Sequence, residues 1–129
     1  MVYDDMLKGL KQAVKHGIKI GIGTDAAMRY VTHYDIWREM KHYMKFAGLT
    51  TAEVIHLVTK ANAEILGVDK RTGTIDIGKS ADLIILDQNP LEEIKALANV
   101  GTVIIRGNII NQPSVTRIKE IDDLLDSIR

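Results

Sequence analysis

The residue in this chain that is best placed to do chemistry is Asp25. It follows an apolar run, Ile18 to Ile22, that reads as a buried strand, and it opens a short polar loop. In parallel α/β folds and barrels, functional side chains gather at the carboxyl ends of strands. A carboxylate at such a position can bind a cation or accept a proton. The alternative is that Asp25 caps the turn that follows, which is a common role for Asp.

Histidine is the second residue type that could carry chemistry, and the chain has four. His33 lies in the loop after Asp25, where it would line any site at the end of the strand. The alternative is a solvent-exposed loop histidine. The others, His16, His42 and His56, fall within or at the end of predicted helices. A zinc site needs about three protein ligands, and the sequence has neither an HxH pair nor an HExxH helix.

Composition narrows the class of protein. The 129 residues carry 17 basic and 17 acidic side chains, and this balance argues against a nucleic-acid partner. The absence of cysteine excludes disulfides and thiolate metal sites and is compatible with a reducing cytosol. No apolar stretch approaches the roughly 20 residues that cross a bilayer, and Asp4 and Asp5 stand where a signal peptide would be basic. We therefore expect a cytoplasmic α/β protein that has no membrane partner.

The elements that must position Asp25 and His33 are helices around one strand. Hydrophobic periodicity predicts helix, strand, loop, helix and helix, over residues 3–16, 18–22, 26–34, 35–47 and about 53–65. Thr50 or Thr51 caps the last of these helices. Each predicted helix ends at a glycine, which is the usual residue after a helix.

The second half of the chain changes to strands and turns. The predicted elements are a short strand between Gly73 and Gly78, a strand over Leu83 to Leu86, a short helix after Pro90, a hairpin over 101–111 and a last amphipathic helix. The dipeptide Gly107-Asn108 is the predicted hairpin turn. The change of character near residues 68–72 predicts a boundary between two subdomains.

Four stretches, "GIKIGIGTDA", "TKANAEILGV", "TGTIDIGKSADLIILDQNPLEEI" and "VIIRGNII", resemble in that order the C-terminal portion of the amidohydrolase superfamily. The resemblance points to the imidazolonepropionase-like and Xaa-Pro dipeptidase-like branch. It implies an α/β fold in which residues 1–67 form the last strand-helix units of a TIM-like metallohydrolase barrel. Residues 68–113 would belong to a small β-sandwich beside the barrel, and residues 114–129 would form a C-terminal amphipathic helix.

The resemblance also gives roles to Asp25 and His33. The stretch "GTDA" is similar to the end of the family's eighth barrel strand, where an Asp binds the active-site metal and accepts a proton from the metal-bound water. The resemblance thereby implies that Asp25 is both a catalytic residue and a ligand of a divalent metal, with zinc as the expected ion. It implies that His33 binds substrate.

The family's HxH motif, its metal-bridging residue and two further histidines have no counterpart in this sequence. We therefore expect the C-terminal part of a metal-dependent amidohydrolase that cleaves an amide or peptide-like C–N bond in a small molecule. The isolated chain should be inactive and should bind no metal tightly. The alternatives are a nucleoside-like or heterocycle deaminase of the same superfamily, and a non-catalytic binding or assembly module. Strand edges left without partners predict a homo-oligomer, with a dimer as its simplest form.

Overall fold

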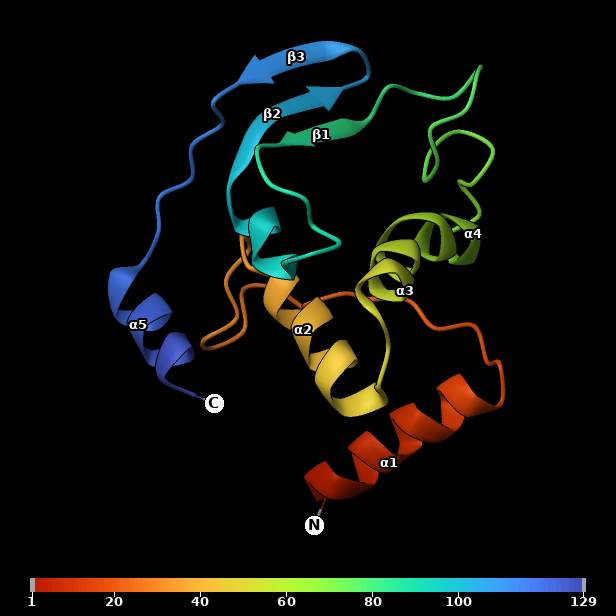
Figure 1. The fold of residues 1–129 in the computed structure, drawn as a ribbon, viewed down its shortest axis with the longest axis vertical. Helices are drawn as coiled ribbons and strands as arrows, with labels where there is room; N and C mark the ends of the chain where they lie inside the picture. The colour runs from red at the N-terminus through yellow and green to blue at the C-terminus, as the bar shows by residue number, and fades with distance from the viewer. Residues whose placement is uncertain (1, 129) are drawn as a thin grey trace.

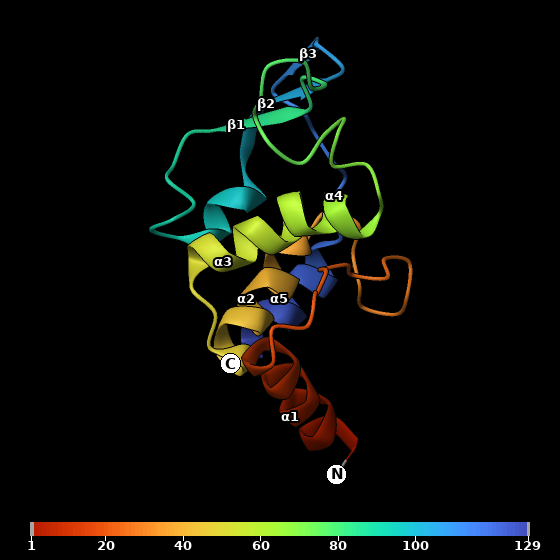
Figure 2. The same cartoon turned by 90° about the vertical axis from the view of Figure 1, so that its right-hand side faces the viewer.

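The structure is a computed structural model that describes residues 2–128, with side chains from Asp5 onward (Figure 1). Its helical elements are α1 (Val2–Lys15), α2 (Ile36–Ala47), α3 (Thr51–His56), η1 (Leu57–Ala61), α4 (Asn62–Ile65), η2 (Ile94–Ala98) and α5 (Lys119–Ser127). Its strands are β1 (Leu83–Leu86), β2 (Val100–Ile105) and β3 (Asn108–Asn111). The result is a mixed α/β fold. The sheet and α1 lie at opposite ends, with α2 and α3 between them (Figure 2).

The three strands form one antiparallel sheet in the order β1-β2-β3. The hairpin forms where the sequence predicts it, but its turn lies one residue earlier. Its central residues are Arg106 and Gly107, with φ of 49° and 81°, and Ile105 pairs with Asn108. Two positive φ values in a two-residue loop are typical of a type I′ turn. The backbone N–H of Arg106 donates a 2.8 Å hydrogen bond to Asp82, which holds the turn against the start of β1.

The predicted strand between Gly73 and Gly78 is wrong. In the structure this stretch is a loop with turns. The hydroxyl of Thr74 donates to the carboxylate of Asp76, two residues on, and such local side-chain bonds compete with strand pairing.

One helical run covers residues 51–65, and its Asn62 side chain contacts the backbone of Ile22. Thr50, and not Thr51, is its cap: the Thr50 hydroxyl accepts a 3.3 Å bond from the Glu53 N–H, and the Glu53 carboxylate accepts a 2.7 Å bond from the Thr50 N–H. This reciprocal capping box starts the helix at Thr51, before the predicted start near residue 53. The run widens to a π-helical turn over η1 and returns to α-helix at Asn62.

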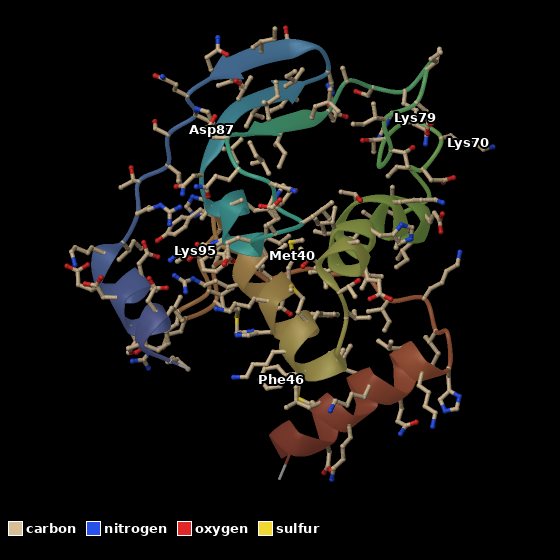
Figure 3. All side chains as sticks on the ribbon, in the orientation of Figure 1. Met40, Phe46, Lys70, Lys79, Asp87 and Lys95 are labelled. Carbon is tan, nitrogen blue, oxygen red and sulfur yellow. The ribbon has the colours of Figure 1, made fainter. Side chains whose placement is uncertain are left out.

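The core is small and is centred on α2. Met40, near the middle of Figure 3, and Val54 are fully buried, and they cluster with the buried Ile22 and Ile94. α2 contacts α1, α3 and η2, so it joins the N-terminal helices to the sheet half of the chain. Gly48, with φ of 75°, ends α2 where the sequence predicts, because a left-handed residue after a helix favours glycine.

Residues 18–25 form no strand, contrary to the expectation for Ile18 to Ile22. A strand needs a backbone neighbour, and every strand that the structure describes belongs to the antiparallel sheet of residues 83–111. The segment instead runs past the inner faces of α2 and the helical run 51–65, with Ile22 in the core. Side chains supply the hydrogen bonds that a neighbouring strand would otherwise make.

The C-terminal helix is shorter than expected. α5 covers Lys119–Ser127, and residues 114–118 approach it without helical structure. α5 lies beside the N-terminal half of α2 and is joined to it by an ion pair between Arg38 and Asp126. Among the described residues, no helix combines the length and apolarity that a membrane crossing requires.

Candidate functional site

Asp25 lies at the end of the extended segment with its carboxylate exposed to solvent. Its φ is 52°, a left-handed value that is uncommon for a residue other than glycine. Within the described chain this carboxylate has no hydrogen-bond or ion-pair partner, so it does not cap the turn that follows. The loop continues with positive φ at Ala27 and Tyr30, which makes residues 25–30 a tightly wound turn. The carboxylate is therefore available to a substrate or a cation.

His33 lies on the same loop and faces a cavity of about 490 Å³. The cavity is bounded on one side by Ala26 to Tyr34 and on the other by Ile118 and Ile121 from the C-terminal part of the chain. The imidazole meets the Tyr34 ring edge to face, with 5.2 Å between ring centroids. The structure thus brings His33 to a mainly apolar recess that begins one residue after Asp25.

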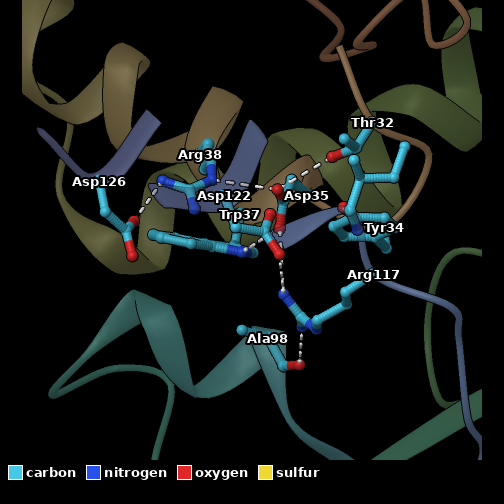
Figure 4. Close-up of polar contacts among 10 residues, drawn as sticks. Thr32, Tyr34, Asp35, Trp37, Arg38, Ala98, Arg117, Asp122 and Asp126 are labelled. Carbon is cyan, nitrogen blue, oxygen red and sulfur yellow. Dashed lines mark hydrogen bonds and ion pairs between the residues drawn. The ribbon is translucent and has the colours of Figure 1, made fainter. Parts of the chain in front are cut away.

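Asp35 is the principal polar residue of this region, and the sequence interpretation missed it. Only 5% exposed, it accepts hydrogen bonds from the Thr32 hydroxyl at 2.9 Å, the Trp37 indole at 3.0 Å and Arg38 Nε at 3.1 Å (Figure 4). Its side chain caps no backbone N–H of α2. The carboxylate therefore fixes the end of the loop to the start of α2. The spacing Thr32-x-x-Asp35 is the only local signal in the sequence for this cluster.

Arg117 connects the same cluster to the C-terminal part of the chain. It donates to the carbonyl of Ala98 at 2.9 Å and lies 3.8 Å from a carboxylate oxygen of Asp35 (Figure 4). Its guanidinium lies over the Tyr34 ring, 5.0 Å from the centroid, and the Tyr34 hydroxyl accepts a 3.0 Å bond from the Ile118 N–H. The loop that carries His33 is thus held from both sides.

Charge in the cluster is balanced by paired groups. The pKa of Asp126 lies below its usual value because Arg38 donates a hydrogen bond to it. Burial opposes the charged form of Arg38, but hydrogen bonds to Asp126 and then Asp35 outweigh that effect and raise its pKa. Arg38 and Asp126 thus each favour the charged form of the other, and their ion pair joins α5 to α2.

The described residues do not by themselves fit a complete metal site. Among them, no group of three or more His, Cys, Asp or Glu side chains is arranged to hold a metal ion. A zinc site needs about three protein ligands. Asp25 offers one free carboxylate at the end of the segment, and none of the four histidines joins it in such a group.

The mixed α/β fold with its small antiparallel sheet is found in structures of the amidohydrolase superfamily, and the sequence comparison agrees. The model of the Amidohydrolase family matches residues 2–110. The chain belongs to the amidohydrolase family.

The curated relatives of this chain include hydrolases and deaminases. The chain is 38% identical over 95 residues to ochratoxinase of Aspergillus niger, covering 71% of this chain and 18% of that protein. It is 31% identical over 88 residues to 5'-deoxyadenosine deaminase of Methanobrevibacter smithii, covering 62% of this chain and 20% of the relative. Imidazolonepropionase of Mesorhizobium japonicum is 35% identical over 79 residues. The chain spans about a fifth of the length of these relatives.

Solved structures give the same family. A Bifidobacterium longum protein assigned as a prolidase superposes with a TM-score of 0.92 at 43% identity, covering 95% of this chain and 30% of that one. A Xaa-Pro dipeptidase with methionine bound in its active site superposes with a TM-score of 0.73 at 34% identity, covering 81% of this chain and 25% of that one.

Proposed function

We propose that the whole protein containing this chain hydrolyses an amide or peptide-like C–N bond in a small molecule. Residues 1–67 would contribute the last part of its catalytic barrel, residues 68–113 part of a β-sandwich, and residues 114–129 the C-terminal helix. The observation that carries the proposal is the free carboxylate of Asp25 beside the cavity of residues 26–34, in a chain of the amidohydrolase family. The likeness to a Xaa-Pro dipeptidase and to ochratoxinase supports an amide substrate over other C–N bonds.

Asp25 is the proposed catalytic residue. A carboxylate within hydrogen-bond reach of a water can accept its proton as the water attacks an amide carbonyl. A divalent metal, with zinc as the ion that the family suggests, would take Asp25 as one ligand. Because no group of three or more ligand side chains is present among the described residues, the chain would contribute to a metal site only Asp25, as one ligand and as the proton acceptor. The 129 residues alone would then turn over no substrate.

His33 is the proposed substrate-binding residue. It faces a recess whose other walls include apolar side chains, among them Met28, Ile118 and Ile121. Such a recess suits an apolar side chain of the substrate, while the imidazole can hydrogen-bond a polar group at its entrance. The chain would thus influence which amide is cleaved as well as how.

Deamination is the second candidate. Its support is the similarity to 5'-deoxyadenosine deaminase and to 5-methylthioadenosine/S-adenosylhomocysteine deaminase of Bacillus cereus, at 31% and 32% identity. A deaminase also adds water to a C–N centre, but it releases ammonia. A binding or assembly module without chemistry is the third alternative.

The products of the reaction separate these candidates. The whole protein should be assayed with divalent metal against Xaa-Pro dipeptides, N-acyl amino acids and adenosine-type nucleosides. Release of an amino acid without ammonia supports the proposal, and removal of metal by a chelator should abolish that release. Ammonia from nucleosides alone would identify a deaminase, and no turnover on any substrate class would favour the binding module.

A further inference from the structure

Asn62 holds the segment that leads to Asp25. Its side-chain oxygen accepts a 2.9 Å hydrogen bond from the Ile22 N–H, and its side-chain nitrogen donates a 2.8 Å bond to the Ile22 carbonyl. The two residues are 40 positions apart in the chain. One amide thus satisfies both backbone groups of one residue, which is what a neighbouring β-strand does for a residue in a sheet.

Three features near Asn62 allow its amide to reach Ile22: the π-helical turn before it, the glycine at position 21 and the Tyr43 side chain. Asn62 follows directly on the π-helical turn of η1, and such turns are rare in α-helices but frequent at functional sites. A Cβ at Gly21 would lie 2.5 Å from the Asn62 side-chain oxygen, so glycine is needed where the amide docks. The Tyr43 hydroxyl donates a 3.3 Å bond to the Gly21 carbonyl and supports the segment from α2.

We propose that Asn62 is a positioning residue for Asp25, an inference that rests on the proposed function. Asp25 is exposed and has no partner of its own within the described chain, so its place depends on the backbone that precedes it. That backbone is fixed three residues upstream by the Asn62 amide. Misplacing a catalytic group by about 1 Å can cost about 100-fold in rate.

The amide is suited to this task because it both donates and accepts. An Asp at position 62 would still accept from the Ile22 N–H, but it would set a negative oxygen against the Ile22 carbonyl. A Leu of similar size would make neither bond. Asn62→Asp therefore removes one of the two hydrogen bonds to Ile22 and Asn62→Leu removes both, while the volume of the side chain changes little.

The test measures kcat, KM and backbone protection in the whole protein for Asn62→Asp and Asn62→Leu. Asn99→Leu, at an exposed asparagine after η2, is the matched control. We expect kcat to fall about 10-fold in Asn62→Asp and about 100-fold in Asn62→Leu, with KM within about threefold of wild type. Hydrogen exchange of the Ile22 amide should quicken strongly in Asn62→Leu, which loses the acceptor, and less in Asn62→Asp, which keeps it. The control should change neither kcat nor this exchange.

A paired substitution separates positioning from folding. Gly21→Ala should lower both the melting temperature and kcat, because the new methyl group displaces the amide. Adding Asn62→Ala should recover melting temperature without recovering kcat. If Asn62→Leu folds and exchanges Ile22 rapidly yet keeps wild-type kcat, the positioning role is overturned. If Asp25→Asn itself keeps wild-type kcat, the proposed function is what fails.

Discussion

Two aspartates ten positions apart show how differently one side chain is used in this loop. Asp25 is exposed, with no partner within the described chain, whereas Asp35 is buried and accepts bonds from Thr32, Trp37 and Arg38. A carboxylate without partners adds little to stability and is available for chemistry. A buried carboxylate with three donors holds structure together.

We expect substitutions of Asp35 and Asp25 to differ clearly in their effect on the free energy of unfolding. Asp35→Ala leaves buried donors unpaired and should lower the free energy of unfolding by about 3–5 kcal/mol. Asp25→Asn should change it by less than about 0.5 kcal/mol, as surface substitutions usually do. Urea denaturation followed by tryptophan fluorescence measures both. An Asp25→Asn variant destabilised as much as Asp35→Ala would show that Asp25 is a structural residue.

His33 should act on binding more than on rate. In the whole protein, His33→Ala removes a group that lines the recess and should raise KM several-fold with little change in kcat, because it does not reach the reacting atoms in our account. His16→Ala, at an exposed histidine after α1, is the control. Steady-state kinetics on the best substrate decide this, and a loss confined to kcat would instead place His33 in the chemical step.

At the scale of elements, local sequence signals predict a helix or strand correctly where nearby residues determine where it begins and ends. The positions of α2, β1 and the hairpin follow from periodicity, from Gly48 and from the turn residues near 107. The Asn62 amide and the Asp35 cluster could not be predicted. The bonds of Asn62 to Ile22 and of Arg117 to Asp35 join segments 40 or more residues apart, and beyond the Thr32-x-x-Asp35 spacing no local pattern encodes them.

Residues 18–22 are predicted as a strand from their composition, but the structure has no strand there. Their composition is that of a buried strand, but a strand also needs a partner, and a helix side chain takes that place here. Asp25 could be selected from sequence because it ends the apolar run. The recess beside it could not, since Ile118 and Ile121 reach it from the far end of the chain.

The packing of the loop after α4 gives an element-scale prediction. Gly73 has a φ of 92°, and a Cβ there would lie 2.5 Å from the Ala63 Cβ. Gly78 has nearly the same φ, 90°, with nothing near its added Cβ. Both Ala substitutions carry the backbone strain of about 1–2 kcal/mol, but Gly73→Ala should cost about 1–3 kcal/mol more because of overpacking. Equal losses in urea denaturation would mean that the loop does not pack on α4.

At the scale of the whole molecule, large apolar side chains remain at the surface. Ile77 and Ile75 are 108% and 86% exposed, and the sheet ends in open edges at β1 and β3. Exposed apolar patches and open edges favour association.

We therefore expect the 129-residue chain to form a homodimer at micromolar concentration. Sedimentation equilibrium measures this directly, and Ile109→Lys on β3 should weaken the dimer if the edge takes part. A stable monomer across the micromolar range would contradict this expectation and would mean that these surfaces need no cover.

The central claim is that Asp25 performs chemistry in an amide hydrolase. Its most direct test is kcat of Asp25→Asn in the whole protein, beside Glu120→Gln, which removes an exposed carboxylate from α5. The Asn side chain keeps the shape of the site but cannot accept the proton. We expect kcat to fall by about 10²–10⁴-fold in Asp25→Asn and to stay at the wild-type value in Glu120→Gln. An Asp25→Asn enzyme that kept wild-type kcat on an amide substrate would contradict the claim.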